Sequence, residues 1–228
     1  AILLAIMFLS ADLLVAQSNH NFGEFDDEKT VHSAIIRTNF TASTYISDIS
    51  PNSVFSSDPY ILSGVNSSNE ARAMLSFSNS VTSIQTVESA VLTLHCNSAD
   101  GIPINQIKSY SAGILRDWRA GESTWFNADI STFWESSGAN GEGDKTPWES
   151  SATYSQIGMT STYDVSFNVT RVVQQSAINF DQSFNFLISS LGGVLECANS
   201  FNQTVSFLPE LILNVNTVTP GDGGQVES

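Results

Sequence analysis

Hydrophobic and polar residues alternate in short runs along most of the chain, which is typical of β-strands with one buried face. The clearest run is residues 89–96 (SAVLTLHC), where every second side chain is apolar or a cysteine. Ser, Asn, Gly and Pro separate the runs, and this pattern predicts an all-β sandwich over residues 41–218. The side chains that we expect in its core are Ala73, Leu75, Phe77, Ala90, Leu92, Leu94, Cys96, Tyr163, Val165, Phe167, Val169, Phe184, Phe186, Ile188, Leu211, Leu213 and Val215.

The rest of the chain departs from this alternation. Residues 19–40 are polar and then mixed, and we expect them to be a connector; residues 219–228 predict a flexible tail. The strand pattern weakens between Arg116 and Gly158, a stretch that carries all four tryptophans and many acids. A loop of this length is more often functional than not. Residues 171–177 (RVVQQSA) predict a short helix.

Residues 1–16 (AILLAIMFLSADLLVA) are almost wholly apolar and contain neither Gly nor Pro. Their composition predicts a helix over residues 1–18, roughly 27 Å long, which is near the lower limit for crossing a bilayer. Asp12 would be costly in a permanent membrane span, so we expect contact with the membrane only before assembly. The alternatives are a signal peptide cleaved after Ala16 and a strand donated to a neighbouring subunit. If the segment is retained, its assembly residues are Ile2, Leu3, Leu4, Ile6, Met7, Phe8, Leu9, Asp12, Leu13 and Leu14.

Two resemblances to known families follow from these segments. Residues 1–18 are similar to the apolar N-terminal helix of type IV pilins, which bundles in a filament core. Residues 41–218 resemble the DNRLRE domain family through residues 71–77 (ARAMLSF), 117–127 (DWRAGESTWFN) and 167–173 (FNVTRVV), with Asn168 where the family usually has Asp. The second resemblance implies a non-catalytic, jelly-roll-like antiparallel β-sandwich on a surface protein, in some members a carbohydrate-binding module. The expected fold is therefore mainly β, preceded by an N-terminal apolar helix.

Charge narrows the choice of partners. The 228 residues include 23 acidic and 8 basic side chains, for a formal net charge of −15. Nucleic acids and anionic polysaccharides need a basic surface, so neither is an expected partner. The expected partners are therefore copies of the chain itself and a neutral glycan.

Cysteine, tryptophan and asparagine side chains are candidates for a disulfide, for sugar binding and for glycosylation. Cys96 and Cys197 form either a disulfide or two separately buried thiols. Trp118 and Trp125 are expected to pack, whereas Trp134 and Trp148 are candidate platforms for a sugar ring. Four sequons, at Asn39, Asn66, Asn168 and Asn202, are candidate glycosylation sites.

Metal binding and catalysis have little support in the sequence. Glu122, Asp129, Glu135, Glu142, Asp144 and Glu149 make the tryptophan-containing loop acidic. Their oxygens suit Ca²⁺, but no calcium-loop motif is present and we expect no cofactor. The histidines are His20, His32 and His95, and no nucleophile, zinc or phosphate-binding motif accompanies them.

The leading hypothesis is a structural subunit of an extracellular, pilus-like filament, which polymerises through residues 1–18 and displays a glycosylated, adhesive β-sandwich. The alternative is a secreted carbohydrate-binding module that tethers a larger protein to glycan. Both place the protein at the cell surface or outside the cell, and neither is an enzyme.

Overall fold

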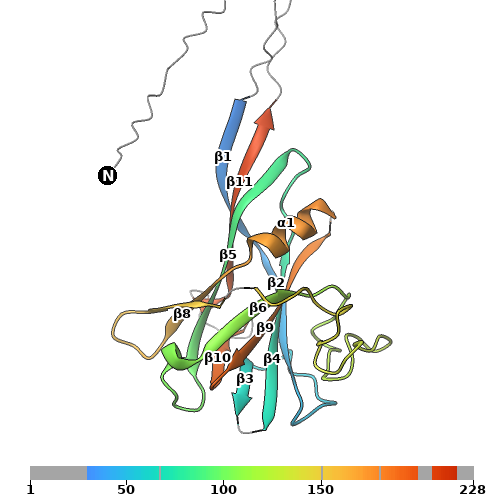
Figure 1. The fold of residues 1–228 in the computed structure, drawn as a ribbon, viewed down its shortest axis with the longest axis vertical. Helices are drawn as coiled ribbons and strands as arrows, with labels where there is room; N and C mark the ends of the chain where they lie inside the picture. Colours follow the sequence, from blue (N-terminus) through green and yellow to red (C-terminus); the bar gives the residue numbers. More distant parts are fainter. Residues whose placement is uncertain (1–29, 67, 150, 180, 200–206, 220–228) are drawn as a thin grey trace, which may run out of the picture.

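The computed structural model describes residues 30–66, 68–149, 151–179, 181–199 and 207–219. Within these ranges the chain is mainly β, and the strands pair antiparallel (Figure 1). The strands are β1 (Thr30–Thr38), β2 (Phe40–Ser47), β3 (Tyr60–Asn66), β4 (Asn69–Ser78), β5 (Gln85–Ser98), β6 (Lys108–Gly113), β7 (Thr153–Gln156), β8 (Tyr163–Asn168), β9 (Ser183–Leu191), β10 (Val194–Ala198) and β11 (Glu210–Thr219). The helices are η1 (Ile104–Gln106), a 3₁₀ turn, and α1 (Thr170–Ile178), which confirms the helix expected there.

The strands form one continuous sheet that curls around its own core. The main path runs β1-β11-β5-β10-β3-β4-β9-β6, while β2 pairs with β4 and β8 pairs with β5 and β7. Phe77 on β4 and Phe167 on β8 belong to the same buried cluster although their strands are far apart in this path. Of the side chains expected in the core, all are buried except Tyr163, which is partly buried against it.

In strand β5, a β-bulge accounts for a break in the alternation of buried side chains. Ala90, Leu92 and Leu94 alternate inward, but Val87 also faces the core although it lies three residues before Ala90. The β5–β11 ladder shifts register at this point, since Ser89 pairs with Asn214 and Val87 with Val215. The bulge leaves one residue unpaired and so restores the inward phase for Val87.

Strand β4 is buried on both sides, which the alternation alone did not predict. One side contributes Ala73, Leu75 and Phe77 to the main core. The other side contributes Met74 to a second cluster, which includes Ile114 just before the long loop and Ala128 and Trp134 within it. The tryptophan-containing loop therefore covers the outer side of the sheet at β4 and β9.

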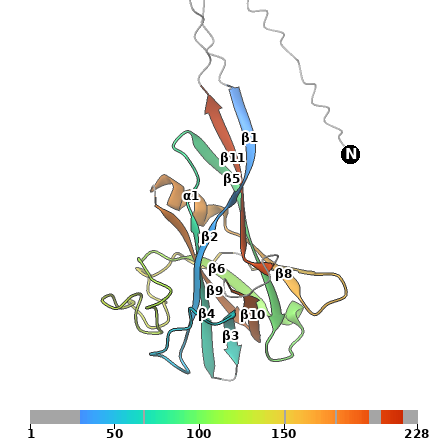
Figure 2. The same cartoon turned by 180° about the vertical axis from the view of Figure 1, so that it is seen from behind.

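The expected connector at residues 19–40 is wrong over its second half. Residues 30–38 form β1, which pairs with β11 from Thr30↔Thr219 to Thr38↔Leu211. Its β-branched residues suit a strand, but its partner lies about 180 residues later and is invisible to local patterns. Together β1 and β11 form a narrow arm that extends beyond the body of the domain. The long loop projects from the body at a different place, away from the arm (Figures 1 and 2).

Candidate binding groove

The long loop is organised around a buried carboxylate, Asp144. Its Oδ1 accepts from the Glu135 N–H at 2.8 Å and from Arg116 Nε at 2.6 Å. Its Oδ2 accepts from the N–H groups of Ser136 at 3.0 Å and Gly141 at 2.9 Å. Burial by itself raises the pKa of Asp144, but these donors outweigh burial and the net pKa is lowered. The charged carboxylate thus holds three parts of the loop together.

Arg72 of β4 fixes the loop to the sheet. Its side chain donates from Nε to Glu70 Oε1 at 2.7 Å and from Nη1 to the Gly138 carbonyl oxygen at 2.5 Å. The guanidinium also lies 5.5 Å from the centre of the Trp125 ring. The buried charge of Arg72 is therefore stabilised by an acid, a carbonyl oxygen and a ring face.

The tryptophans do not lie where the sequence analysis expected them to act. Trp134 is 5 % exposed and donates its indole N–H to the Thr124 carbonyl oxygen at 3.0 Å, so its ring is a packing residue with no face open to a sugar. Trp148 packs partly against the same cluster, and Lys145 Nζ lies 4.7 Å from its ring centre. Burial, and then the charge of Arg72, lower the pKa of Lys145. One face of Trp148 therefore already carries a cation.

Trp118 instead lines an open cavity. Its indole N–H donates to Asn185 Oδ1 at 3.1 Å, and Asn185 Nδ2 donates to Ser183 Oγ at 3.0 Å. The cavity beside it has a volume of about 440 Å³, and a neighbouring one of about 500 Å³ shares Asp117, Ser183 and Asn185 with it. We call these two cavities the Trp118 groove; it lies between residues 115–120, β9 and the end of α1.

The cations of the Trp118 groove are already paired. Arg116 binds the buried Asp144, and Arg119 lies 3.5 Å from Glu122. Asp117 and Asp181 also line the groove, and neither side chain forms an ion pair with another described residue. An anionic sugar would gain little binding energy in this groove, because each nearby guanidinium is already paired with a carboxylate.

Sequence reasoning missed Trp118, Asp117 and Asn185 as groove residues. Trp118 was assigned to packing, which it also does at its other edge. The available signal was the triplet Asp117-Trp118-Arg119, an aromatic residue between an acid and a base at the start of the loop. Asn185, by contrast, belongs to a strand 67 residues later and could be placed only by the fold.

Four of the six acidic loop residues that were weighed for Ca²⁺, namely Glu122, Asp129, Glu135 and Asp144, accept hydrogen bonds from protein donors. Asp129 accepts from the N–H and hydroxyl groups of Ser131 and Thr132, and these hydrogen bonds lower its pKa. Glu135 accepts from the Gly143 N–H at 2.6 Å. In the described ranges, no group of three or more His, Cys, Asp or Glu side chains is placed to hold a metal ion.

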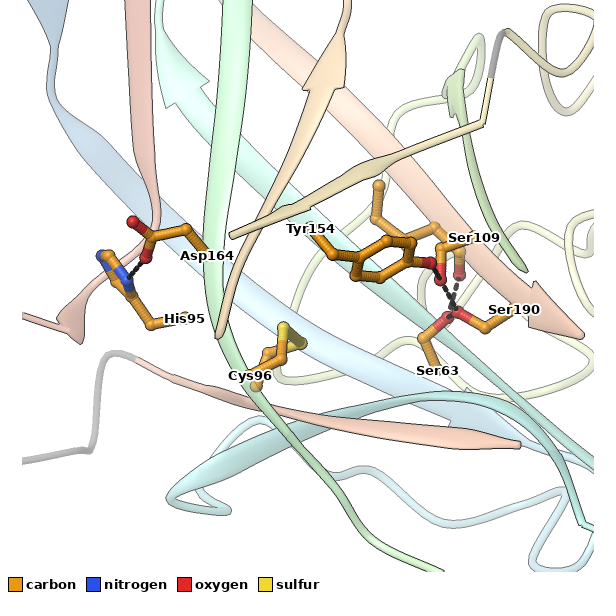
Figure 3. Close-up of a disulfide and its surroundings, with 9 residues drawn as sticks. Ser63, His95, Cys96, Ser109, Tyr154, Asp164 and Ser190 are labelled. Carbon is orange, nitrogen blue, oxygen red and sulfur yellow. Dashed lines mark hydrogen bonds and ion pairs between the residues drawn. A yellow bond between two sulfur atoms is a disulfide. The ribbon is translucent and has the colours of Figure 1, made fainter. Parts of the chain in front are cut away.

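Cys96 and Cys197 form a disulfide, the first of the two alternatives left open by the sequence. They are directly opposite residues of β5 and β10, with Cα atoms 4.0 Å apart, and both are buried in the core. Figure 3 shows the disulfide beside two polar groups: the His95–Asp164 pair, with Nδ1 and Oδ1 2.6 Å apart, and a buried chain of serine hydroxyls with Tyr154. The bond is compatible with an oxidising compartment.

The three described sequon asparagines, Asn39, Asn66 and Asn168, are exposed. Asn168 Oδ1 accepts from the N–H and the hydroxyl of Thr170, at 3.1 and 2.7 Å, at the start of α1. These bonds form a local turn just before α1, whose N-cap residue is Val169 and which has no side-chain cap hydrogen bond. Asn202 lies outside the described residues.

The expected assembly residues 2–14 also lie outside the described residues, so the apolar helix, the signal peptide and the donated strand all remain predictions. Among the helices in the described part, none combines the length and the hydropathy needed to cross a bilayer.

No model of a known protein family matches the chain, and no curated protein matches it. The resemblances to the DNRLRE family and to type IV pilins therefore stay predictions.

Proposed function

We propose that this chain is a non-catalytic extracellular binding domain that takes a neutral glycan in the Trp118 groove. The observation that carries the proposal is a tryptophan that is held by a side-chain hydrogen bond and lines one of two neighbouring cavities, which share Asp117, Ser183 and Asn185. Pockets that bind small ligands combine a few fixed polar groups with apolar or aromatic surface, and this groove has both.

The chemistry of the lining suits a sugar ring. The flat face of an indole packs against the C–H groups of a pyranose, while planar amide and carboxylate groups pair with neighbouring hydroxyls. Asn185 is oriented by Trp118 and Ser183, and Asp117 is free to accept from a hydroxyl because it is exposed beside them. The paired state of Arg116 and Arg119 favours a neutral rather than an anionic glycan.

Three other features support display outside the cell. The disulfide suits an oxidising compartment, and the exposed sequons suit a glycosylated surface. The arm of β1 and β11 brings the two ends of the described domain together at a site remote from the loop (Figures 1 and 2). For the curled sheet we propose the jelly-roll-like sandwich, an architecture that serves binding on many surfaces.

The test compares the two partly buried tryptophans, Trp118 and Trp148, in one glycan-binding assay. We expect Trp118→Ala to weaken binding to a panel of neutral oligosaccharides by about 10- to 100-fold, as loss of a stacking platform does. Trp148→Ala is the matched control and should bind as the native protein does. Because Trp118 also packs, Asp117→Ala provides a second variant that removes only an exposed groove side chain. Native binding without loss in either groove variant, or loss only in Trp148→Ala, would contradict the proposal.

The filament subunit remains our second proposal, and the arm is the feature that favours it. The described chain begins at the outer end of β1, which is remote from the Trp118 groove. Burying the nine apolar side chains among the expected assembly residues at about 1.5–3 kcal/mol each would drive a stable polymer. Electron microscopy of the full chain and of a chain lacking residues 1–18 is the test: filaments in the first only support this role, and filaments in both, or in neither, contradict it.

A further inference from the structure

We propose that a second site, where β5, β8 and β10 meet, binds a protonated amine or guanidinium group. The site is separate from the Trp118 groove and does not depend on the glycan proposal. It is a cavity of about 230 Å³ lined by His95, Asn97 and Glu196 together with Tyr60 and Phe207.

The strand pattern places the polar residues together on the outer side of the sheet. His95 and Asn97 flank Cys96 in β5, and Glu196 precedes Cys197 in β10. Successive side chains of a strand point to opposite sides, and both cysteines are in the core, so these three residues point away from it. The ladder pairs Glu196 directly with Asn97.

The cavity is rich in hydrogen-bond acceptors. Asn97 Oδ1 is buried and accepts no hydrogen bond from the described residues. Glu196 lines the cavity and forms no ion pair within the described part of the chain. A buried carbonyl oxygen without a donor is uncommon and is costly to the folded state.

Among the described residues, the cavity lacks the positively charged hydrogen-bond donors of lysine and arginine. Neither Lys nor Arg is among the described residues that line it. His95 lies at the cavity with its Nδ1 2.6 Å from Asp164 Oδ1, so this imidazole is already paired with a carboxylate. A ligand with several N–H donors and a positive charge would therefore satisfy Asn97 and balance Glu196 at once.

Two aromatic rings at the cavity also suit a cationic ligand. Tyr60 is 39 % exposed at the cavity, and the Phe207 ring lies edge-on to His95 with centroids 5.8 Å apart. Ring faces attract ammonium and guanidinium groups, most strongly where water is excluded. The volume is below that of pockets for drug-sized ligands, so the ligand is a group the size of a Lys or Arg side chain.

The probes are n-butylammonium and methylguanidinium, with n-butanol as the neutral control, added to the full chain and followed by calorimetry and by amide chemical shifts. We expect the two cations to bind and shift amides of β5 and β10, and the alcohol not to bind. Glu196→Gln should weaken cation binding by at least 10-fold. Glu88→Gln is the matched control, since Glu88 is exposed on the same β5 strand but does not line the cavity.

Asn97→Leu, which fills the position without an acceptor, should also weaken cation binding, while circular dichroism checks that each variant is folded. Equal binding of butanol, absence of cation binding, or equal affinities of the Glu196 and Glu88 variants would overturn the proposal. A lysine residue capped as Nα-acetyl-lysine methylamide identifies the source of the amine. Tighter binding than n-butylammonium indicates a polypeptide partner, and weaker binding indicates a free small amine; either result supports the site.

Discussion

Replacing Asp144 with Asn is expected to loosen the long loop while the sheet stays folded. Asp144 is fully buried and accepts four hydrogen bonds, two at each carboxylate oxygen. An amide has one oxygen and one NH₂ group, and that NH₂ would face either two backbone N–H groups or an N–H and the Arg116 guanidinium. Whichever way the amide lies, two hydrogen bonds to a charged acceptor are lost.

The magnitude follows from those lost contacts. Hydrogen bonds to a charged group contribute about 1.5–3 kcal/mol each, and breaking a buried ion pair costs about 3–5 kcal/mol. We therefore expect the free energy of unfolding of the loop to fall by about 3–5 kcal/mol. Asp117→Asn is the matched control, because Asp117 is exposed and has no ion pair with another described residue.

The chain provides its own probe for this experiment. All four tryptophans, Trp118, Trp125, Trp134 and Trp148, lie in the long loop. Urea unfolding followed by tryptophan fluorescence therefore reports on the loop, and far-ultraviolet circular dichroism reports on the sheet. In Asp144→Asn the fluorescence transition should move to lower urea and separate from the circular dichroism transition, which marks local unfolding.

Acid provides an independent check of the same reasoning. The folded pKa of Asp144 is lowered from its ordinary value of 3.8, so its stabilisation is present above that pH and is lost as the pH falls further. Native protein should lose loop stability below about pH 4 more steeply than Asp144→Asn. A loss below about 1 kcal/mol at pH 7, or identical acid profiles of the two proteins, would refute a structural role for this carboxylate.

Three further predictions concern the fold. Cys197→Ser should cost up to about 4.7 kcal/mol of stability, the value expected for a cross-link closing a loop of roughly 100 residues, and dithiothreitol should lower the native melting temperature but not the variant's. Gly138→Ala should lower loop stability in the fluorescence assay, because φ is 77° and a Cβ would lie 2.6 Å from Trp125, whereas Gly121→Ala, with no atom within 4 Å of the added carbon, should be neutral. Phe167→Ala in the core should cost about 3–5 kcal/mol by urea unfolding, and Phe133→Ala, which is 68 % exposed, should cost little; comparable losses would contradict the burial argument.

Local patterns were sufficient where one strand has one buried side. The inward residues of β5, β8 and β11 follow from alternation because a strand places successive side chains on opposite sides. The helix α1 was predicted from a short run of suitable residues between two strands. These features depend on neighbours within a few positions, which a single sequence displays.

Patterns failed where a partner lies far along the chain. Residues 30–38 were assigned to a connector because their pairing with β11 cannot be seen locally. Met74 was not predicted as buried, since the loop that covers it begins some forty residues later. The two bonding states of Cys96 and Cys197 could be separated only when β5 and β10 were brought side by side.

The sequence by itself determined the β class, the positions of most core residues, and the presence of an acidic, tryptophan-containing loop, because each depends on composition and short-range periodicity. The tertiary structure decided which tryptophan lines a cavity: Trp134 is buried, Trp148 carries Lys145, and Trp118 lines the groove. It also brought Asn97 and Glu196 to one cavity from strands about a hundred residues apart. The physical reason is that burial and hydrogen-bond partners are properties of contacts between distant segments, which only the folded chain creates.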